Sequence, residues 1–302
     1  MRFSIVIPTK NRPEELKKIF ASIMIQTKLP DQIVIIDQSS RDKIIKNELK
    51  AVLENKKIEL NYLCNNKIKG LVEAKFYSLN FCKHEIISFF DDDIVLKPDY
   101  IEKVDFAFEK YPKIIGANGV ILNIPKKNFI QRFFFKITHK GIFSDNRYEV
   151  ISSINNKKPQ PLLVNTLSGG LSSWRKEVLK KVSFDINNHF HSYEDKEFSI
   201  RINKNYPNGM YIIPEAKLNH FHSEINREAV INLIKMNVFE IIIIYKKNKD
   251  ISFFGLDLLL LLFSLMIKAF LWSLFNFHIG EIKSFLLGFK DGYHHKIKAD
   301  ER

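Results

Sequence analysis

Residues 86–90, Ile-Ile-Ser-Phe-Phe, end in three consecutive aspartates, Asp91, Asp92 and Asp93. The β-branched and aromatic residues of this run predict a buried strand. Three neighbouring carboxylates are hard to ionise together, and a divalent cation such as Mg²⁺ removes that cost. Ligands of open α/β sheets bind beyond the carboxyl ends of strands, so this junction indicates a site for a metal and a nucleotide. The alternative is a solvated turn before a helix that starts near Pro98.

Short apolar runs alternate with helical patterns through the first half of the chain. The first helical pattern places Leu16, Ile19 and Ile23 on one face, and Pro13 suits its opening turn. This alternation predicts an α/β fold with a mixed, mainly parallel sheet and right-handed crossovers. The expected strands are residues 4–7, 32–36, 58–63, 86–90, 114–121 and 210–213, and the expected helices are 14–25, 42–53, 72–82, 100–110 and 194–204.

The size and charge of the chain limit its partners. Its 302 residues are enough for one large α/β domain and an appendage. A net charge of +13 indicates an anionic partner, such as a nucleotide diphosphate or an acidic membrane surface. Nucleic acid is not expected, because lysine and arginine form no basic stripe interleaved with aromatic residues. Cys64 and Cys82 lack metal-ligand spacing and are expected as reduced core residues.

Two regions depart from the alternating pattern. Residues 123–161 are basic and aromatic around Phe133-Phe134-Phe135, and are expected to form an insertion or mobile loop that contacts the acceptor. Residues 251–277 are strongly apolar, with Lys268 near their middle. A monotopic or re-entrant helical anchor is favoured there, a single transmembrane span is possible, and a buried helical hairpin is the alternative. The expected domains are therefore residues 1–222 and a membrane-associating segment, residues 223–302.

The N-terminal sequence enters a strand at once, and its apolar stretch is too short for a secretory signal. We therefore expect the catalytic part on the cytoplasmic face of the inner or plasma membrane. Polar residues follow the first two strands, as Thr9-Lys10-Asn11 and Asp37-Gln38-Ser39-Ser40. Neither is a glycine-rich phosphate-binding loop. A nucleotide would instead be held by Asp37 and by a metal between its diphosphate and the acid triplet.

Several ordered motifs resemble the family 2 glycosyltransferases, which have the GT-A fold, over roughly the first 222 residues. The resemblance implies a nucleotide-sugar donor, here a UDP- or dTDP-sugar, inversion at the anomeric carbon, and Mg²⁺ or Mn²⁺ as cofactor. The matching residues are Val6-Ile7-Pro8-Thr9, Asp37 with Ser39 and Ser40, Gly70 with Ala74 and Lys75, the acid triplet with Pro98, Gly169-Gly170 with Arg175, and Glu194-Asp195 with Arg201.

The resemblance also implies roles for individual residues. Asp93 would be the main metal ligand, with Asp92 in that role if the register shifts by one. Asp91 would contact ribose or the metal, and His220, ahead of His222, would contact metal or diphosphate. Gln38 departs from the second acid of many relatives, and Lys75 stands where relatives often have arginine. The residues that would bind the nucleotide are Pro8, Thr9, Asn11, Asp37, Lys75, Asp91 and Asp92.

The segment Tyr193-Glu194-Asp195 resembles the catalytic-base motif of the family. Inverting transfer needs one carboxylate to take the proton of the acceptor hydroxyl, which would be Asp195, with Glu194 orienting the acceptor. The alternative is an acidic first turn stabilised by the helix dipole. Gly169, Gly170 and Trp174 would also bind the acceptor, although Trp174 suits a core position equally well.

The expected function is a metal-dependent inverting glycosyltransferase of the hexosyl- or deoxyhexosyltransferase class. It would act on a lipid-linked or growing cell-envelope glycan. A polyprenyl-phosphate sugar synthase of the same family and a non-catalytic, membrane-bound assembly subunit are alternatives. A sugar nucleotidyltransferase is disfavoured, since Lys10-Asn11-Arg12 is not a glycine-rich loop.

Overall fold

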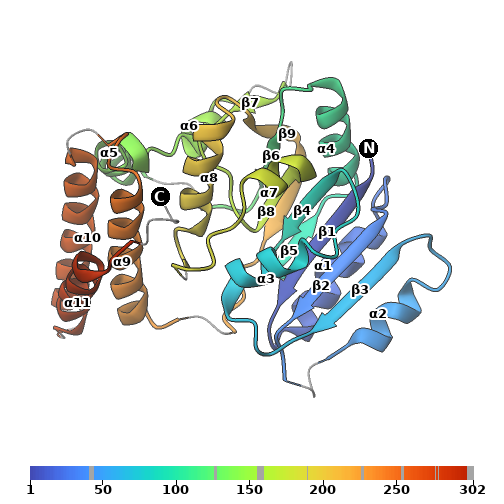
Figure 1. The fold of residues 1–302 in the computed structure, drawn as a ribbon, viewed down its shortest axis with the longest axis horizontal. Coiled ribbons are helices and arrows are strands. Elements are labelled where there is room, and N and C mark those ends of the chain that lie inside the picture. Colours follow the sequence, from blue (N-terminus) through green and yellow to red (C-terminus); the bar gives the residue numbers. More distant parts are fainter. Residues whose placement is uncertain are drawn as a thin grey trace. The chain divides into compact units, whose positions relative to one another are not determined.

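The computed structural model describes residues 1–40, 44–125, 128–154, 160–188, 190–225, 228–252, 255–275, 277 and 279–297 (Figure 1). These residues divide into two compact units, which are described separately. The first unit comprises Met1–Ile124, Asn146–His189 and Arg201–Arg227. The second comprises Pro125–Asp145, Phe190–Ile200 and Glu228–Arg302. A domain boundary after residue 222 stays a prediction.

The first unit is built on one mixed sheet, with nine strands in the described part of the chain. Its strand order is β3-β2-β1-β4-β8-β6-β9-β5, and β7 pairs with β9. The predicted α/β class is confirmed, and β1 to β4 are parallel neighbours as the alternation indicates. The strands are β1 (Phe3–Thr9), β2 (Gln32–Asp37), β3 (Glu59–Cys64), β4 (Ile86–Phe90), β5 (Ile94–Leu96), β6 (Gly116–Ile121), β7 (Leu162–Leu163), β8 (Leu171–Arg175) and β9 (Met210–His220).

The sequence pattern did not reveal β8, which lies antiparallel between β4 and β6. β8 brings the segment that contains Gly169 and Gly170 to the carboxyl end of β4, because antiparallel pairing places Leu171 opposite Phe90. The sheet therefore reverses direction beside the acid triplet. The strand order also reverses between β1 and β4, and such a switch point of an open α/β sheet is where ligands bind.

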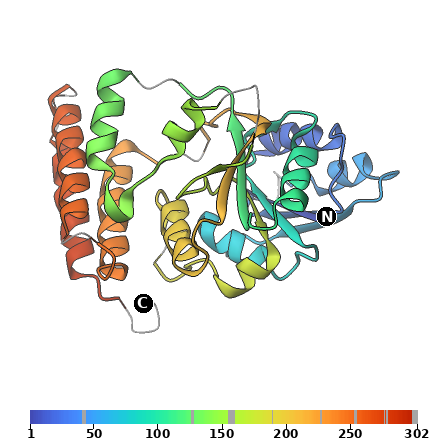
Figure 2. The ribbon, with the colours of Figure 1, turned by 90° about the horizontal axis from the view of Figure 1, so that it is seen from above.

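Helices cover both faces of this sheet, with α1 and α4 on one face and α3 and α7 on the other (Figure 2). Ile5 and Ile33 join Leu16 and Val104 in the core on the first face, because alternate strand residues share a face. The helices of the first unit are α1 (Pro13–Met24), α2 (Lys46–Val52), α3 (Gly70–Ser78), α4 (Tyr100–Lys110), α6 (Arg147–Ser152) and α7 (Lys176–Lys181), and α8 (Glu194–Asn205) carries residues of both units. The predicted helix start at Asp42 lies outside the described residues.

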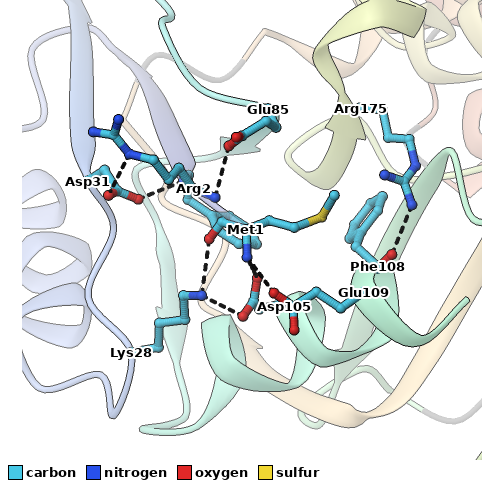
Figure 3. Close-up of polar contacts among 10 residues, drawn as sticks. Met1, Arg2, Lys28, Asp31, Glu85, Asp105, Phe108, Glu109 and Arg175 are labelled. Atoms are coloured by element: carbon cyan, nitrogen blue, oxygen red, sulfur yellow. Dashed lines mark hydrogen bonds and ion pairs between the residues drawn. The ribbon is translucent and has the colours of Figure 1, made fainter. Parts of the chain in front are cut away.

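Polar contacts fix the amino ends of β1, β2 and β4 (Figure 3). The backbone N–H of Arg2 donates to Glu85 at 2.9 Å, and its Nε lies 3.1 Å from Oδ1 of Asp31. Asp105 accepts from both Lys28 and the amino group of Met1. These contacts lie at the edge of the parallel strands opposite the acid triplet, so the carboxyl edge is left for ligands.

The predicted insertion forms helices where a loop was expected. Within it lie α5 (Phe129–Thr138) and a 3₁₀ turn, η2 (Gly141–Phe143), both in the second unit, while residues 126–127 and 155–159 lie outside the description. Asn128 starts α5 with a capping box: its side chain accepts from the N–H of Gln131 at 2.8 Å, and its own N–H donates to the Gln131 side chain at 3.0 Å. The box satisfies two backbone donors that the helix start would otherwise leave unpaired.

The second unit also contains α9 (Val230–Lys247), α10 (Leu256–Phe275) and α11 (Gly280–His294), which lie side by side, with α5 against α10 (Figures 1 and 2). Gly288 lets α11 approach α9 closely, since a Cβ there would meet the carbonyl oxygen of Lys235 at 2.4 Å. Among the described residues, α10 is one helix long and apolar enough to cross a membrane, with a mean hydropathy of 2.3 and only 22% of its most apolar window buried. The C-terminal region thus contains one candidate membrane-associating helix.

Candidate active site

Three side chains of the first unit meet beyond the carboxyl end of β4. Asp91 and Asp93 follow β4, and His220 ends β9. The antiparallel pairing of β5 with β9 places Ile94 opposite His220, which brings the imidazole to the acids. Nε2 of His220 lies 2.9 Å from Oδ1 of Asp93 and 4.0 Å from Oδ2 of Asp91. One ligand atom from each residue lies within 4.8 Å of the other two, which we call the acid–histidine cluster.

Backbone contacts hold the cluster in place. His220 donates its N–H to Oδ1 of Asn123 and accepts from Nδ2 of Asn123 through its carbonyl, both at 2.8 Å. Oδ2 of Asp93 accepts from the N–H of Ser223 at 2.9 Å. The ring of His222 lies 4.0 Å from the ring of His220, but only His220 belongs to the cluster. The preference of the sequence analysis for His220 over His222 as a metal ligand stays a prediction.

Asp92 has different surroundings, although it lies between the two cluster acids in the sequence. Only 3% of it is exposed, and its carboxylate accepts from the Thr9 hydroxyl at 2.7 Å and from Arg12 at 3.0 Å. These contacts tie the acid triplet to the end of β1. The carboxylate of Asp92 therefore already has hydrogen-bond partners within the protein. This disfavours Asp92 as the metal ligand, the role it would have if the register of the motif shifted by one residue.

The three aspartates differ in acidity because their surroundings differ. Burial raises the pKa of Asp91, against the opposing charge of Lys75. Burial also raises the pKa of Asp92 to about 6, although its bonds to Thr9 and Arg12 act in the opposite direction. Burial acts the same way on Asp93, but the His220 imidazole and the N–H of Ser223 outweigh it and lower the pKa of Asp93 to about 2. Asp93 is thus the acid most readily available as an anion.

The cluster fits a divalent cation. Oδ1 of Asp93 is buried and, apart from its close contact with His220, accepts no hydrogen bond from the residues that the structure describes. A buried oxygen needs a donor or a cation as its partner, and here the His220 imidazole or a bound ion can fill that role. Carboxylate oxygens suit Mg²⁺ and Mn²⁺, and an imidazole nitrogen is a further ligand for a transition metal. Asp91, Asp93 and His220 are the residues that would hold the ion.

Hydrogen bonds join the ends of β1 and β2 beside this cluster, where Asn11, Asp37 and Ser39 form one wall of the site. Asn11 adopts a left-handed conformation with φ of +54°, donates its N–H to the Ser39 hydroxyl at 2.6 Å and accepts from the N–H of Ser40 at 3.0 Å. Asp37 is 1% exposed and accepts from the N–H of Ser39 at 2.8 Å and from the hydroxyl of Tyr62. Sequence reasoning missed Tyr62, because only the register of β3 against β2 brings it beside Asp37.

The remaining predicted residues of the first unit lie either close to the acid–histidine cluster or in the core. Lys75 on α3 is 1% exposed, and its positive charge opposes the rise in the pKa of Asp91. Pro8 and Thr9 end β1, and Gly170 lies directly against Asp91. Trp174 is 2% exposed in β8, and a Cβ on Gly116 would meet its ring at 2.4 Å, which favours the core position over stacking on an acceptor.

Glu194 and Asp195 begin α8 in the second unit. Glu194 is buried, Asp195 is half-buried, and the N–H of Glu197 donates to the carbonyl of Tyr193 at 2.9 Å to close the first turn. The carboxylate of Glu240 on α9 accepts hydrogen bonds from three consecutive backbone N–H groups just before this helix, those of residues 191–193. No sequence signal pointed to Glu240, which stands in an otherwise apolar stretch of helix.

Comparison with known proteins decides the family. The model of "Glycosyl transferase family 2" matches residues 4–183, well over half of the chain. The chain belongs to this family. It is similar to an uncharacterized glycosyltransferase of Haemophilus influenzae, with 22% identity over 66% of this chain and 61% of the relative, and to one of Rickettsia conorii, with 24% identity over 84% of this chain and 44% of the relative. The chain thus spans about half the length of the curated relatives it matches.

Solved structures confirm the fold of this member of the family. GalNAc-T7 with UDP, GalNAc and Mn²⁺ matches with a TM-score of 0.61, 15% identity, and coverage of 82% of this chain and 48% of the other. The mannosyltransferase PcManGT of Pyrobaculum calidifontis, in complex with GDP-Man and Mn²⁺, matches with a TM-score of 0.57 and 13% identity. The match covers 83% of this chain and 65% of the other. S. aureus TarS 1–349 with UDP-GlcNAc matches with a TM-score of 0.53 and 16% identity, over 81% of this chain and 66% of the other. At these low identities the matches show the fold alone. It is the GT-A fold that the sequence motifs predicted.

Proposed function

We propose that this glycosyltransferase is metal-dependent and inverting, and that it moves a hexosyl or deoxyhexosyl group from a nucleotide diphosphate sugar to a lipid-linked or growing envelope glycan. The observation that carries the proposal is the acid–histidine cluster at the carboxyl edge of the sheet. Two fold relatives were solved with a nucleotide or nucleotide sugar and Mn²⁺, which supports the same kind of ligand here.

Each part of the site would have a separate task in binding the donor. Asp91, Asp93 and His220 would hold Mn²⁺ or Mg²⁺, which when bound neutralises charge that develops on the leaving diphosphate. Lys75 would add a second positive charge near the phosphates. The wall of Asn11, Asp37 and Ser39 is held by hydrogen bonds between strand ends, so it would orient base and ribose without first having to become ordered.

The transfer step needs a base on the acceptor side. The acceptor hydroxyl oxygen would attack the anomeric carbon and form the new C–O bond, while the bond from that carbon to the diphosphate oxygen breaks. Asp195 would take the hydroxyl proton, and Glu194 would orient the acceptor. The attack comes from the face opposite the leaving group, so the anomeric configuration is inverted.

The second unit supports a lipid-linked acceptor at a membrane. A groove of about 740 Å³ runs between α5 and α10, lined by apolar residues such as Phe134 and Leu271 and by polar ones that include His139 and Lys268. Phe133 on α5 and Phe263 on α10 are both 56% exposed, as expected for helices that contact lipid rather than a protein core. We further propose that α10 anchors the enzyme to the inner or plasma membrane and that it acts at the cytoplasmic face.

A thermal-shift screen tests donor and metal together, since a ligand that binds only the native state raises the unfolding temperature. UDP, dTDP and GDP are each added with and without Mn²⁺. One nucleotide should raise the unfolding temperature clearly, and only with the metal. An equal rise without Mn²⁺ would contradict the metal dependence, and no rise with any nucleotide would contradict the donor class.

Transfer of radiolabelled sugar separates the possible acceptors. Label on a glycolipid carrying an exposed sugar supports glycan extension, and label on polyprenyl phosphate identifies the alternative synthase. The variant Asp195→Asn should lose transfer while it keeps the Mn²⁺-dependent thermal shift. Unchanged transfer in that variant would remove Asp195 from the base role, and absence of transfer by the wild-type protein under all conditions would favour the assembly-subunit alternative.

A further inference from the structure

A buried carboxylate from α9 holds the chain immediately before the proposed catalytic base. Oε1 of Glu240 accepts from the N–H of His191 at 2.8 Å, and Oε2 accepts from the N–H groups of Ser192 at 3.0 Å and Tyr193 at 2.7 Å. Glu240 itself is 2% exposed. One side chain thus satisfies three consecutive backbone donors at the start of α8.

A second buried charge links the same two helices. Nζ of Lys247 lies 3.0 Å from Oε1 of Glu197, and the two side chains are 6% and 3% exposed. Lys247 lies two turns beyond Glu240 on α9, and Glu197 lies in the first turn of α8. Because both contacts lie within the second unit, α9 holds the start of α8 at two points, on either side of Asp195.

Polar groups that serve only stability are an unusual choice at such positions. An apolar side chain at position 240 would suit its surroundings, because Ile243 and Ile244, which share its face of α9, are both buried. Buried charges cost desolvation free energy unless hydrogen bonds fix them, and in some proteins buried polar groups are retained because they specify one arrangement of the backbone. The arrangement specified here is the turn that carries Glu194 and Asp195.

We propose that Glu240 is a positioning residue for transfer, which fixes the turn of residues 191–193 and thereby aims Asp195 at the acceptor hydroxyl. Lys247 supports the same turn through Glu197. This inference rests on the proposed function, in which Asp195 is the base. It gives α9 a role in the chemical step, in addition to any part in anchoring the enzyme, because an error of about 1 Å in the place of a reacting group can cost about 100-fold in rate.

The test compares Glu240→Gln with a matched control, Glu281→Gln. Glu281 is also a buried acid of the second unit, and its side chain accepts from the hydroxyl of Ser273 at 3.2 Å. In Glu240→Gln an amide NH₂ faces the backbone donors, so kcat should fall about 10- to 100-fold, while KM for the donor and its Mn²⁺-dependent thermal shift stay within about twofold. Glu281→Gln should leave kcat and KM unchanged.

Hydrogen–deuterium exchange supplies a direct readout of the turn. The backbone amides of residues 191–193 should exchange faster in Glu240→Gln than in the wild type and in Glu281→Gln. Glu240→Asp keeps the carboxylate but shortens the side chain by one methylene, so it should give an intermediate kcat and intermediate exchange. Should Glu240→Gln fail to fold, Glu240→Asp carries the same comparison.

The variant Asp195→Asn distinguishes failure of the inference from failure of the proposed function. If Asp195→Asn is inactive and the Glu240 variants keep the wild-type kcat despite faster exchange at residues 191–193, the positioning role is wrong. If Asp195→Asn is fully active, the base assignment itself is wrong. If Asp195→Asn is inactive and kcat of the Glu240 variants falls as the exchange at residues 191–193 rises, the inference is supported.

Discussion

The carboxylate of Asp91 lies directly against the Cα of Gly170, in the space that a Cβ at position 170 would fill. Such a Cβ would be 1.8 Å from Oδ2 of Asp91, far inside van der Waals contact, and the N–H of Asp91 donates to the carbonyl of Gly170 at 2.8 Å. A glycine before β8 is therefore required for Asp91 to reach the acid–histidine cluster.

Substitution Gly170→Ala should disable the cluster without unfolding the protein. The short side chain of Asp91 can rotate away from the added methyl group, which removes one ligand from the metal site. We expect at least a tenfold loss of Mn²⁺-dependent nucleotide affinity in a thermal-shift titration. Gly209→Ala is the control, since its Cβ would also overlap a side chain, that of Ile115 at 2.4 Å, but at the other end of β9 from His220. Equal metal dependence in both variants would contradict the role of Asp91.

Asp93→Asn should affect metal binding, whereas Asp92→Asn should affect the stability of the protein. Asp93→Asn should abolish the Mn²⁺ dependence of the nucleotide thermal shift, because it removes the most acidic ligand of the cluster. Asp92→Asn should keep that dependence but lower the free energy of unfolding by about 2 kcal/mol, since it weakens charged hydrogen bonds with Thr9 and Arg12. The reverse pattern would show that Asp92 is the metal ligand.

The stability of the wild type relative to Glu240→Gln should fall as the pH rises from about 4.5 to about 7. Burial raises the pKa of Glu240 to about 7, despite the opposing backbone hydrogen bonds, so the native state binds this proton more tightly than the unfolded state does. Ionisation through that window therefore costs native stability, on the order of 3 kcal/mol at most. Unfolding temperatures of both proteins between pH 5 and pH 8 check this, and parallel pH profiles would contradict it.

Replacing Phe133 and Phe134 together by serine should weaken membrane binding and leave the fold intact. Both side chains are about half exposed on α5, so little core is lost. Flotation with phosphatidylglycerol vesicles measures the loss. As a control, Phe143→Ser should destabilise the protein by about 4 kcal/mol, because Phe143 is 1% exposed. A double serine variant that unfolds, or that still binds vesicles fully, would remove α5 from the membrane surface.

The helices and strands of the first half could be predicted because their signals are local. The face of α1 that carries Leu16, Ile19 and Ile23 is buried as its spacing requires, and the run before Asp91 forms a central strand. Residues 123–161 were expected to form an insertion or mobile loop, and α5 within them is a helix whose start depends on the capping box of Asn128 and Gln131.

The sequence by itself determined the α/β class, the family and the place of the acid triplet at the end of a strand. Only the tertiary structure decided which acids face the cluster, since Ser223 reaches Asp93 from a position 130 residues away. It also paired β8 with β4, Tyr62 with Asp37, and Glu240 with the turn before Asp195. These contacts depend on strand register and helix packing between distant segments, and no local pattern of residue types specifies them.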